Sequence, residues 1–207
     1  LYEQSWRPRL QRHGTVNADG FGIGWYPLEA DPDGFTEPAR YRRAVPVWAD
    51  TNLPDLARTI RSGAVLAAVR SATAGTSQDE SAAAPFRDGR WLFSHNGAVP
   101  DWTRLPVTEA TADLLGMESR CDSALPWAMV SRRLRQGQQP AGAMASVVRE
   151  VAAARPGARL NLLLTDGRTV VAARWGDTLW YRAEPGAVLV ASEPDDAPGR
   201  WQEVPDR

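Results

Sequence analysis

The chain has 207 residues with 24 basic and 25 acidic side chains, so its formal net charge is −1 at pH 7. This balance provides no overall positive field for nucleic acid or anionic lipid, and no apolar run approaches the roughly 18 residues of a membrane-spanning helix. The length predicts one domain, residues 1–207, with a core of its own. The single cysteine excludes an internal disulfide and favours a cytoplasmic location.

In the first predicted strand, residues 21–25, apolar residues alternate with glycines. This alternation is typical of a strand whose glycine face is open to close packing or to a ligand. Residues 41–47 predict another strand of the same sheet. The helical spacing of apolar residues predicts a helix over 53–60, with Asn52 as its N-cap and Gly63 beyond its end.

Two apolar segments in the middle of the chain lead into polar clusters. Residues 64–69 are a continuous apolar run, which predicts a strand buried on both faces, and Arg70 follows directly. A second strand, residues 90–93, follows a turn at residues 88–89 and leads into the sequence Ser-His-Asn-Gly at 94–97. Chemistry is expected where these two strands end.

The residue types at these two strand ends suit acyl transfer. The planar guanidinium of Arg70 is suited to binding a carboxylate. The side-chain amide of Asn96 and the backbone N–H of Gly97 are donors of the kind that stabilise a developing oxyanion. Two simpler interpretations stay open: Arg70 pairs with an acid at the sheet edge, and Asn96-Gly97 is only a hairpin turn.

The polar segment between the two strands, residues 76–81, is predicted to be a mobile loop. Its acids Asp79 and Glu80 would attract a cationic substrate if the segment closed as a lid. A solvated, charged loop is the simpler alternative.

The second half of the chain predicts two helices followed by a meander. Residues 106–117 are expected to form a loop with a short helical turn. The helices are expected from Asp122 to Gly137 and over 141–154, and the four antiparallel strands over 160–164, 169–174, 179–182 and 187–191. Strands, two helices and strands again, without βαβ alternation, predict an α+β fold with largely antiparallel sheets.

Two residues before the first of these helices allow several roles. Asp122 stands where a helix N-cap is expected. Cys121 is the only thiol, and a cysteine hydrolase would pair it with His95 or His13. The adjacent Asp122, however, raises rather than lowers the pKa of that thiol. Two histidines and one cysteine are too few for a persuasive zinc site, so we predict no metal and no cofactor.

Three motifs connect this chain to a known family: Arg-Ser-Ala-Thr-Ala-Gly at 70–75, Pro-Phe at 85–86 and His-Asn-Gly at 95–97. In this order and spacing they resemble the class II glutamine amidotransferases of the N-terminal-nucleophile hydrolase superfamily. Within that superfamily the chain is most similar to the γ-glutamyl amidohydrolases of ergothioneine biosynthesis, which release glutamate from γ-glutamyl-hercynylcysteine sulfoxide. The similarity extends from the opening SWRPRLQRHG to the late VASEP.

The resemblance implies a fold and a role for each site residue. The fold is a four-layer αββα sandwich of two mainly antiparallel sheets. Arg70 is expected to bind the α-carboxylate of a γ-glutamyl group and Asp122 its α-ammonium, with Thr73 also at the substrate. Asn96 and Gly97 are expected to form the oxyanion hole. The base is expected to be the α-amino group of an N-terminal cysteine, which leaves His95 a structural role.

The resemblance also implies a missing segment. Mature chains of this superfamily begin with the catalytic cysteine and a first strand, so we expect the printed sequence to lack both and to be inactive by itself. Ser71 and Ala74 are smaller than the residues that glutaminases often have there, which favours a leaving amine larger than ammonia.

The expected partner is therefore a small γ-glutamyl substrate, not nucleic acid or a membrane. Two alternatives stay open: a glutaminase subunit that supplies ammonia to a partner synthase, and a non-catalytic γ-glutamyl-binding protein.

Overall fold

The computed structural model describes residues 1–13, 16–28, 36–105, 117–195 and 200–207. The described α-helices are α1 (Leu53–Thr59), α3 (Ala124–Arg135) and α4 (Pro140–Ala154). The described strands are β1 (Phe21–Trp25), β2 (Ala39–Arg43), β3 (Val65–Val69), β4 (Phe86–Asp88), β5 (Trp91–Ala98), β6 (Arg159–Thr165), β7 (Val170–Ala173), β8 (Trp180–Glu184), β9 (Ala187–Ala191) and β10 (Gln202–Glu203).

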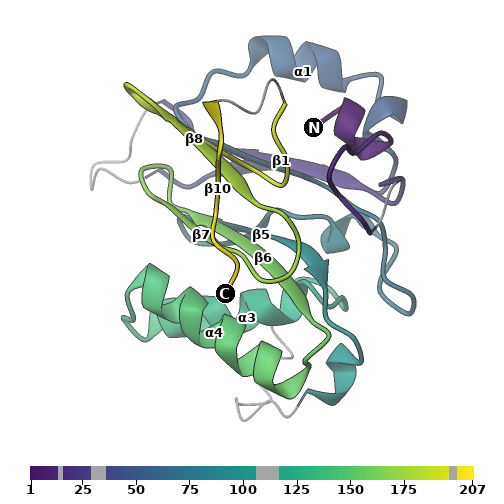
Figure 1. Ribbon diagram of the computed structural model, residues 1–207. Helices are drawn as coiled ribbons and strands as arrows, with labels where there is room; N and C mark the ends of the chain where they lie inside the picture. Colours follow the sequence, from purple (N-terminus) through teal and green to yellow (C-terminus); the bar gives the residue numbers. More distant parts are fainter. Residues whose placement is uncertain (14–15, 29–35, 106–116, 196–199) are drawn as a thin grey trace.

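These elements form a layered α+β fold with antiparallel sheets, as predicted. The strands are ordered β2-β1-β3, β4-β5-β6-β7 and β10-β8-β9 in three sheets within the described ranges. In Figure 1, α1 lies outside the layer of β1, and α3 and α4 cover the far side of the layer that contains β5, β6 and β7. This is the expected order of helix, sheet, sheet and helix.

The sheet that contains β5 is buried on both faces, because adjacent side chains along a strand point to opposite sides. Phe93 faces the helices and stacks on Trp127 of α3, with ring centroids 5.2 Å apart. Its neighbour Leu92 packs on the other side with Tyr26 and Leu66. The strand β5 therefore lies between two hydrophobic layers that fix its position.

The glycines of β1 serve this sheet-to-sheet contact. A Cβ on Gly22 would lie 2.2 Å from the backbone oxygen of Ala84, and one on Gly24 would lie 2.7 Å from Cδ1 of Leu92. Neither distance leaves room for a side chain. Close packing, rather than approach of a ligand, therefore explains the alternating glycines.

The structure confirms the predicted helices, but the predicted N-cap of α1 is wrong. Helices α3 and α4 lie where they were expected, and Gly137 follows α3 with a φ of +81°. Asn52, however, makes no capping bond through its side chain. Oδ1 of Asp50 instead accepts the N–H groups of Asn52 and Leu53, so the acid two residues earlier caps α1.

Two predictions about the central strands are wrong. Val65 is 58% exposed, so β3 is not buried on both faces. The second strand does not end at residue 93, because β5 pairs with β6 as far as Ala98. Asn96 lies opposite Asn161 and Gly97 opposite Leu160, so the pair is not a hairpin turn.

The predicted C-terminal meander is divided between two sheets. β6 pairs with β7, whereas β8 pairs with β9 and β10 in a separate sheet. The turn near Gly176 is therefore a connection between sheets rather than a hairpin. The predicted loop at 106–117 lies almost wholly outside the described residues, which resume at Met117.

Candidate active site

All five residues predicted from the sequence line one cavity of about 220 Å³. The cavity lies where β3 ends, beside the C-terminal half of β5 and the residues that lead into α3. The five residues are Arg70, Thr73, Asn96, Gly97 and Asp122. They come from three separate parts of the chain, and the fold brings them together.

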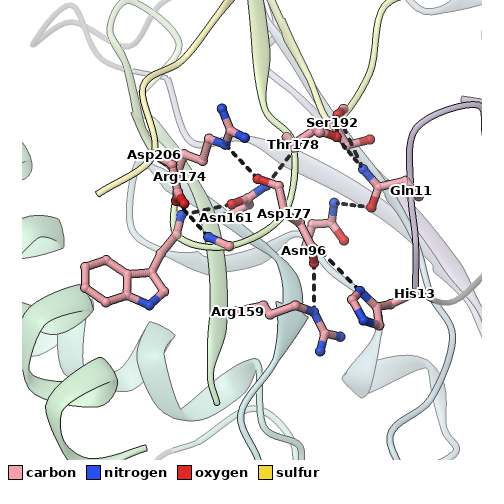
Figure 2. Close-up of polar contacts among 12 residues, drawn as sticks. Gln11, His13, Asn96, Arg159, Asn161, Arg174, Asp177, Thr178, Ser192 and Asp206 are labelled. Atoms are coloured by element: carbon pink, nitrogen blue, oxygen red, sulfur yellow. Dashed lines mark hydrogen bonds and ion pairs between the residues drawn. The ribbon is translucent and has the colours of Figure 1, made fainter. Parts of the chain in front are cut away.

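Asn96 and Gly97 form one wall of this cavity. The Asn96 side chain is exposed, and within the described ranges its Nδ2 makes only a long bond of 3.4 Å to Oε1 of Gln11 (Figure 2). Gly97 has a φ of +148°, and a Cβ there would lie 2.0 Å from the backbone oxygen of Arg159. Only glycine fits at this position, and the Asn96 amide is available to a ligand.

Arg70 is held by the loop that follows it. Its Nη2 donates to the Ser77 carbonyl at 2.6 Å and to Oγ1 of Thr76 at 2.9 Å, and its Nη1 lies 3.5 Å from the Asp19 carbonyl. Within the described ranges no carboxylate forms an ion pair with this guanidinium, so the predicted alternative of a sheet-edge ion pair is wrong. The guanidinium of Arg70 is thus oriented by neutral oxygens and has no carboxylate in direct contact among the described residues.

Asp122 is buried, with 5% of its surface exposed, and it is not the N-cap of α3. Its Oδ2 accepts the Val99 N–H at 3.1 Å and the Thr73 hydroxyl at 3.2 Å. Among the described residues, none donates a hydrogen bond to Oδ1. The carboxylate is therefore fixed through one oxygen, and the other remains available to a cationic group in the cavity.

His95 joins three elements of the site as a neutral ring. Its Nε2 lies 2.8 Å from the Arg159 carbonyl, which can only accept, so Nε2 carries the proton. Its Nδ1 therefore accepts the Ser123 hydroxyl at 2.9 Å. Burial lowers the pKa of His95 below its ordinary value. Both nitrogens are engaged, which favours the structural role over that of a base.

Comparison with known proteins shows which family the chain belongs to. The family model of the class II glutamine amidotransferases matches residues 4–196. The chain belongs to this family. It is 44% identical over its whole length to a γ-glutamyl-hercynylcysteine sulfoxide hydrolase of Mycolicibacterium smegmatis, of which it covers 83%. A hydrolase of the same name from Mycobacterium tuberculosis is 42% identical, also over the whole chain and 80% of the relative.

Solved structures show the same fold. A class II glutamine aminotransferase domain protein from Silicibacter pomeroyi superposes with a TM-score of 0.65 at 24% identity, over 92% of this chain and 89% of the other. A predicted glutamine amidotransferase from Pseudomonas aeruginosa gives a TM-score of 0.52 at 17% identity, over 95% and 85%. The resemblance inferred from the motifs is confirmed.

In this amidotransferase, Cys121 is a poor candidate for the nucleophile. The thiol is buried, and burial is the main cause that raises its pKa, with the neighbouring Asp122 charge adding to it. A thiol with a raised pKa is protonated at neutral pH. His95, its nearest candidate base in sequence, already bonds Ser123 and Arg159. The alternative of a Cys121 hydrolase is therefore not supported.

The segment at 76–81 is joined to its surroundings through its first two residues. Thr76 is buried, and the Ser77 N–H donates to the Arg120 carbonyl at 2.9 Å. Asp79 accepts bonds from Ser77 and Ser81, which lower its pKa to about 2. The segment therefore positions Arg70 through Thr76 and Ser77, while Asp79 and Glu80 are exposed, as the alternative of a solvated, charged loop predicts.

Sequence reasoning did not assign Ser123, Arg159 or Asp177, which also line the cavity. Ser123 follows Asp122 directly, and this adjacency was a usable signal. Arg159 and Asp177 reach the site only through the pairing of β6 with β5 and the turn after β7, which no local pattern reveals.

No helix in the described chain is long and apolar enough to cross a membrane. The described residues also contain no cluster of three or more His, Cys, Asp or Glu suited to a metal.

Proposed function

We propose that this protein is a γ-glutamyl amidohydrolase of ergothioneine biosynthesis that releases glutamate from γ-glutamyl-hercynylcysteine sulfoxide. The observation that carries the proposal is the placement of Arg70 and Asp122 in one cavity with Asn96 and Gly97. The names of the relatives that match the whole chain support the same substrate.

The cavity matches the charges of a glutamyl head group. The α-carboxylate is assigned to Arg70, whose charge has no carboxylate partner among the described residues. The α-ammonium is assigned to Asp122, whose Oδ1 accepts no bond from the described chain, with Thr73 alongside. Charge-assisted bonds of this kind contribute about 1.5–3 kcal/mol each. Together they would select a γ-glutamyl group with a free α-amino acid end.

The chemistry then follows the acyl-transfer pattern. A cysteine thiolate attacks the γ-carbonyl carbon, and the resulting oxyanion accepts hydrogen bonds from the Asn96 amide and the Gly97 N–H. The carbon–nitrogen bond breaks, and the leaving amine departs with a proton. Water then hydrolyses the thioester, which releases glutamate and restores the thiol.

The nucleophile is assigned to an N-terminal cysteine that is not among the 207 residues. Two sheet edges support this assignment, because β3 and β9 each have one edge without a partner strand in the described parts of the chain. These two edges line one groove of about 650 Å³, where Val65 and Val188 are more than half exposed. His95 and Asn96 line both this groove and the cavity. A strand in the groove could therefore hold its N-terminal cysteine beside the proposed oxyanion donors.

We place the enzyme in the cytoplasm. The single cysteine among the 207 residues, Cys121, is a free thiol buried in the core. A buried thiol without a disulfide partner fits a reducing compartment.

The test is the intact mass of the full-length gene product before and after incubation with an electrophilic glutamine analogue. We expect a mature chain that begins at cysteine and gains one covalent adduct, and no adduct when that cysteine is replaced by alanine. No adduct on the wild-type protein would overturn the proposal and favour a γ-glutamyl-binding protein. An adduct with release of glutamate only from glutamine would favour a glutaminase subunit.

A further inference from the structure

A second arginine and aspartate lie at the same cavity as Arg70 and Asp122. Arg159, the first residue of β6, and Asp177, in the turn before β8, both line it. In Figure 2 the two side chains point toward each other beside Asn96, and His13 lies near the second oxygen of the same carboxylate. Neither residue has a part in the proposed binding of the glutamyl group.

The ion pair uses only part of the Arg159 guanidinium. Nε of Arg159 donates to Oδ2 of Asp177 at 2.9 Å, and Nδ1 of His13 lies 3.4 Å from Oδ1. Among the described residues, Nη1 and Nη2 of Arg159 have no hydrogen-bond partner. The Arg159 side chain is 28% exposed and that of Asp177 11%. The aspartate thus holds one edge of the guanidinium and leaves the paired Nη donors available to a ligand.

The position of Arg159 along β6 places it close to the reacting bond. Arg159 lies opposite Ala98 in the β5–β6 pair, next to the oxyanion donor Gly97. Its backbone oxygen also bonds His95, so the residue is anchored to the wall of the cavity. In a γ-glutamyl-amino acid, a single carbon separates the amide nitrogen from the second α-carboxylate. That carboxylate must therefore lie near the oxyanion donors, on the side away from the glutamyl head group.

We propose that Arg159 forms a subsite for the α-carboxylate of the leaving amine, so that the site prefers γ-glutamyl-α-amino acids to other γ-glutamyl amides. The inference rests on the proposed function and names the residue that selects the leaving group. The second amino acid of such a substrate carries its nitrogen in the amide bond, so only its carboxylate needs an ionic partner. Arg159 is this ionic partner, and Asp177 is a positioning residue for the Arg159 guanidinium.

The test compares two substrates of the full-length gene product: γ-glutamyl-hercynylcysteine sulfoxide, and its analogue with a carboxamide in place of the cysteinyl carboxylate. Release of glutamate is measured for the wild type and for Arg159→Gln. We expect the wild type to prefer the carboxylate by about tenfold to a hundredfold in kcat/KM, and Arg159→Gln to abolish this preference. The carboxamide should be hydrolysed almost equally by both proteins.

A matched control is Arg149→Gln, which changes an exposed arginine of α4 outside the cavity and should keep the wild-type preference. Equal hydrolysis of the two substrates by the wild type would overturn the subsite while leaving the proposed function intact. Equal losses on both substrates in Arg159→Gln would assign the arginine a structural role and also overturn it. Release of glutamate from neither substrate by the wild type would overturn the proposed function and the subsite together.

Discussion

The polar side chains of the candidate site are oriented by groups from other segments of the chain. The Asp122 carboxylate is fixed by the Val99 N–H beyond the end of β5, and the Arg70 guanidinium by the Ser77 carbonyl. Backbone groups in packed structure move little, so each charge is placed before a substrate arrives. Preorganisation of this kind limits the entropy lost when a ligand binds.

At the residue scale, Asn96→Ala should reduce turnover with little effect on folding. The Asn96 side chain is exposed and makes only one long hydrogen bond to the described residues, so the substitution removes the proposed oxyanion donor and leaves the packing unchanged. We expect kcat to fall by about 100- to 1,000-fold with an unchanged melting temperature. Steady-state kinetics and a thermal melt of the full-length enzyme measure both. An unchanged kcat would remove Asn96 from the mechanism.

Arg70→Lys should act mainly on substrate binding. A lysine ammonium keeps the charge but cannot bond Ser77 and Thr76 while presenting a planar pair of donors to a carboxylate. We expect KM to rise by about tenfold or more, with a smaller change in kcat. Arg61→Lys, an exposed change at a residue outside the cavity, is the control. A variant with the KM of the wild type would argue against the carboxylate assignment.

At the element scale, the agreement between sequence and structure depends on how local the signal is. Helices α3 and α4 were predictable because their apolar residues repeat at helical spacing and end at a glycine or before a proline. The length of β5 was not predictable from the sequence, because pairing with β6 overrides the turn signal of Asn96-Gly97. The same pairing brings Arg159 to the site, and its register depends on contacts far apart in sequence.

Gly97→Ala should destabilise β5 and β6 strongly. The new Cβ would meet the Arg159 oxygen at 2.0 Å, and the φ of +148° is rarely adopted by alanine. We expect the free energy of unfolding to fall by at least about 2 kcal/mol. Gly142→Ala is the matched control, because a Cβ on this α4 glycine would have no heavy atom within 4 Å, and the variant should gain about 0.5–1 kcal/mol. Urea unfolding of both variants measures the difference, and equal effects would contradict the geometry.

The link that His95 forms between β5, β6 and the start of α3 should depend on pH. Its pKa in the folded protein lies below the ordinary value of 6.5, because burial favours the neutral ring. The unfolded chain therefore takes up the proton first as the pH falls, and stability is complete above about pH 7.5 and decreases below about 6.5. NMR titration of the His95 ring should give a midpoint below pH 6.5, so that the neutral imidazole is the majority form at that pH. Half-protonation at that pH would contradict the assignment.

At the scale of the whole molecule, the two central layers converge on the cavity from opposite sides. β3 of one sheet delivers Arg70, and β5 of the next carries Asn96 and Gly97. The motifs were sufficient to predict the family and to name residues that line one cavity, because they lie in short continuous segments. The division of the C-terminal strands between two sheets was not predictable, since turn signals do not distinguish a hairpin from a connection between sheets.

The rate of glutamate release by the full-length gene product from γ-glutamyl-hercynylcysteine sulfoxide and from glutamine tests the central claim most directly. If the cavity binds a γ-glutamyl group with a large leaving amine, kcat/KM should be higher for the sulfoxide by about 100-fold, a difference of roughly 2.7 kcal/mol in transition-state binding. Equal or higher kcat/KM for glutamine, or no glutamate from the sulfoxide, would contradict the account.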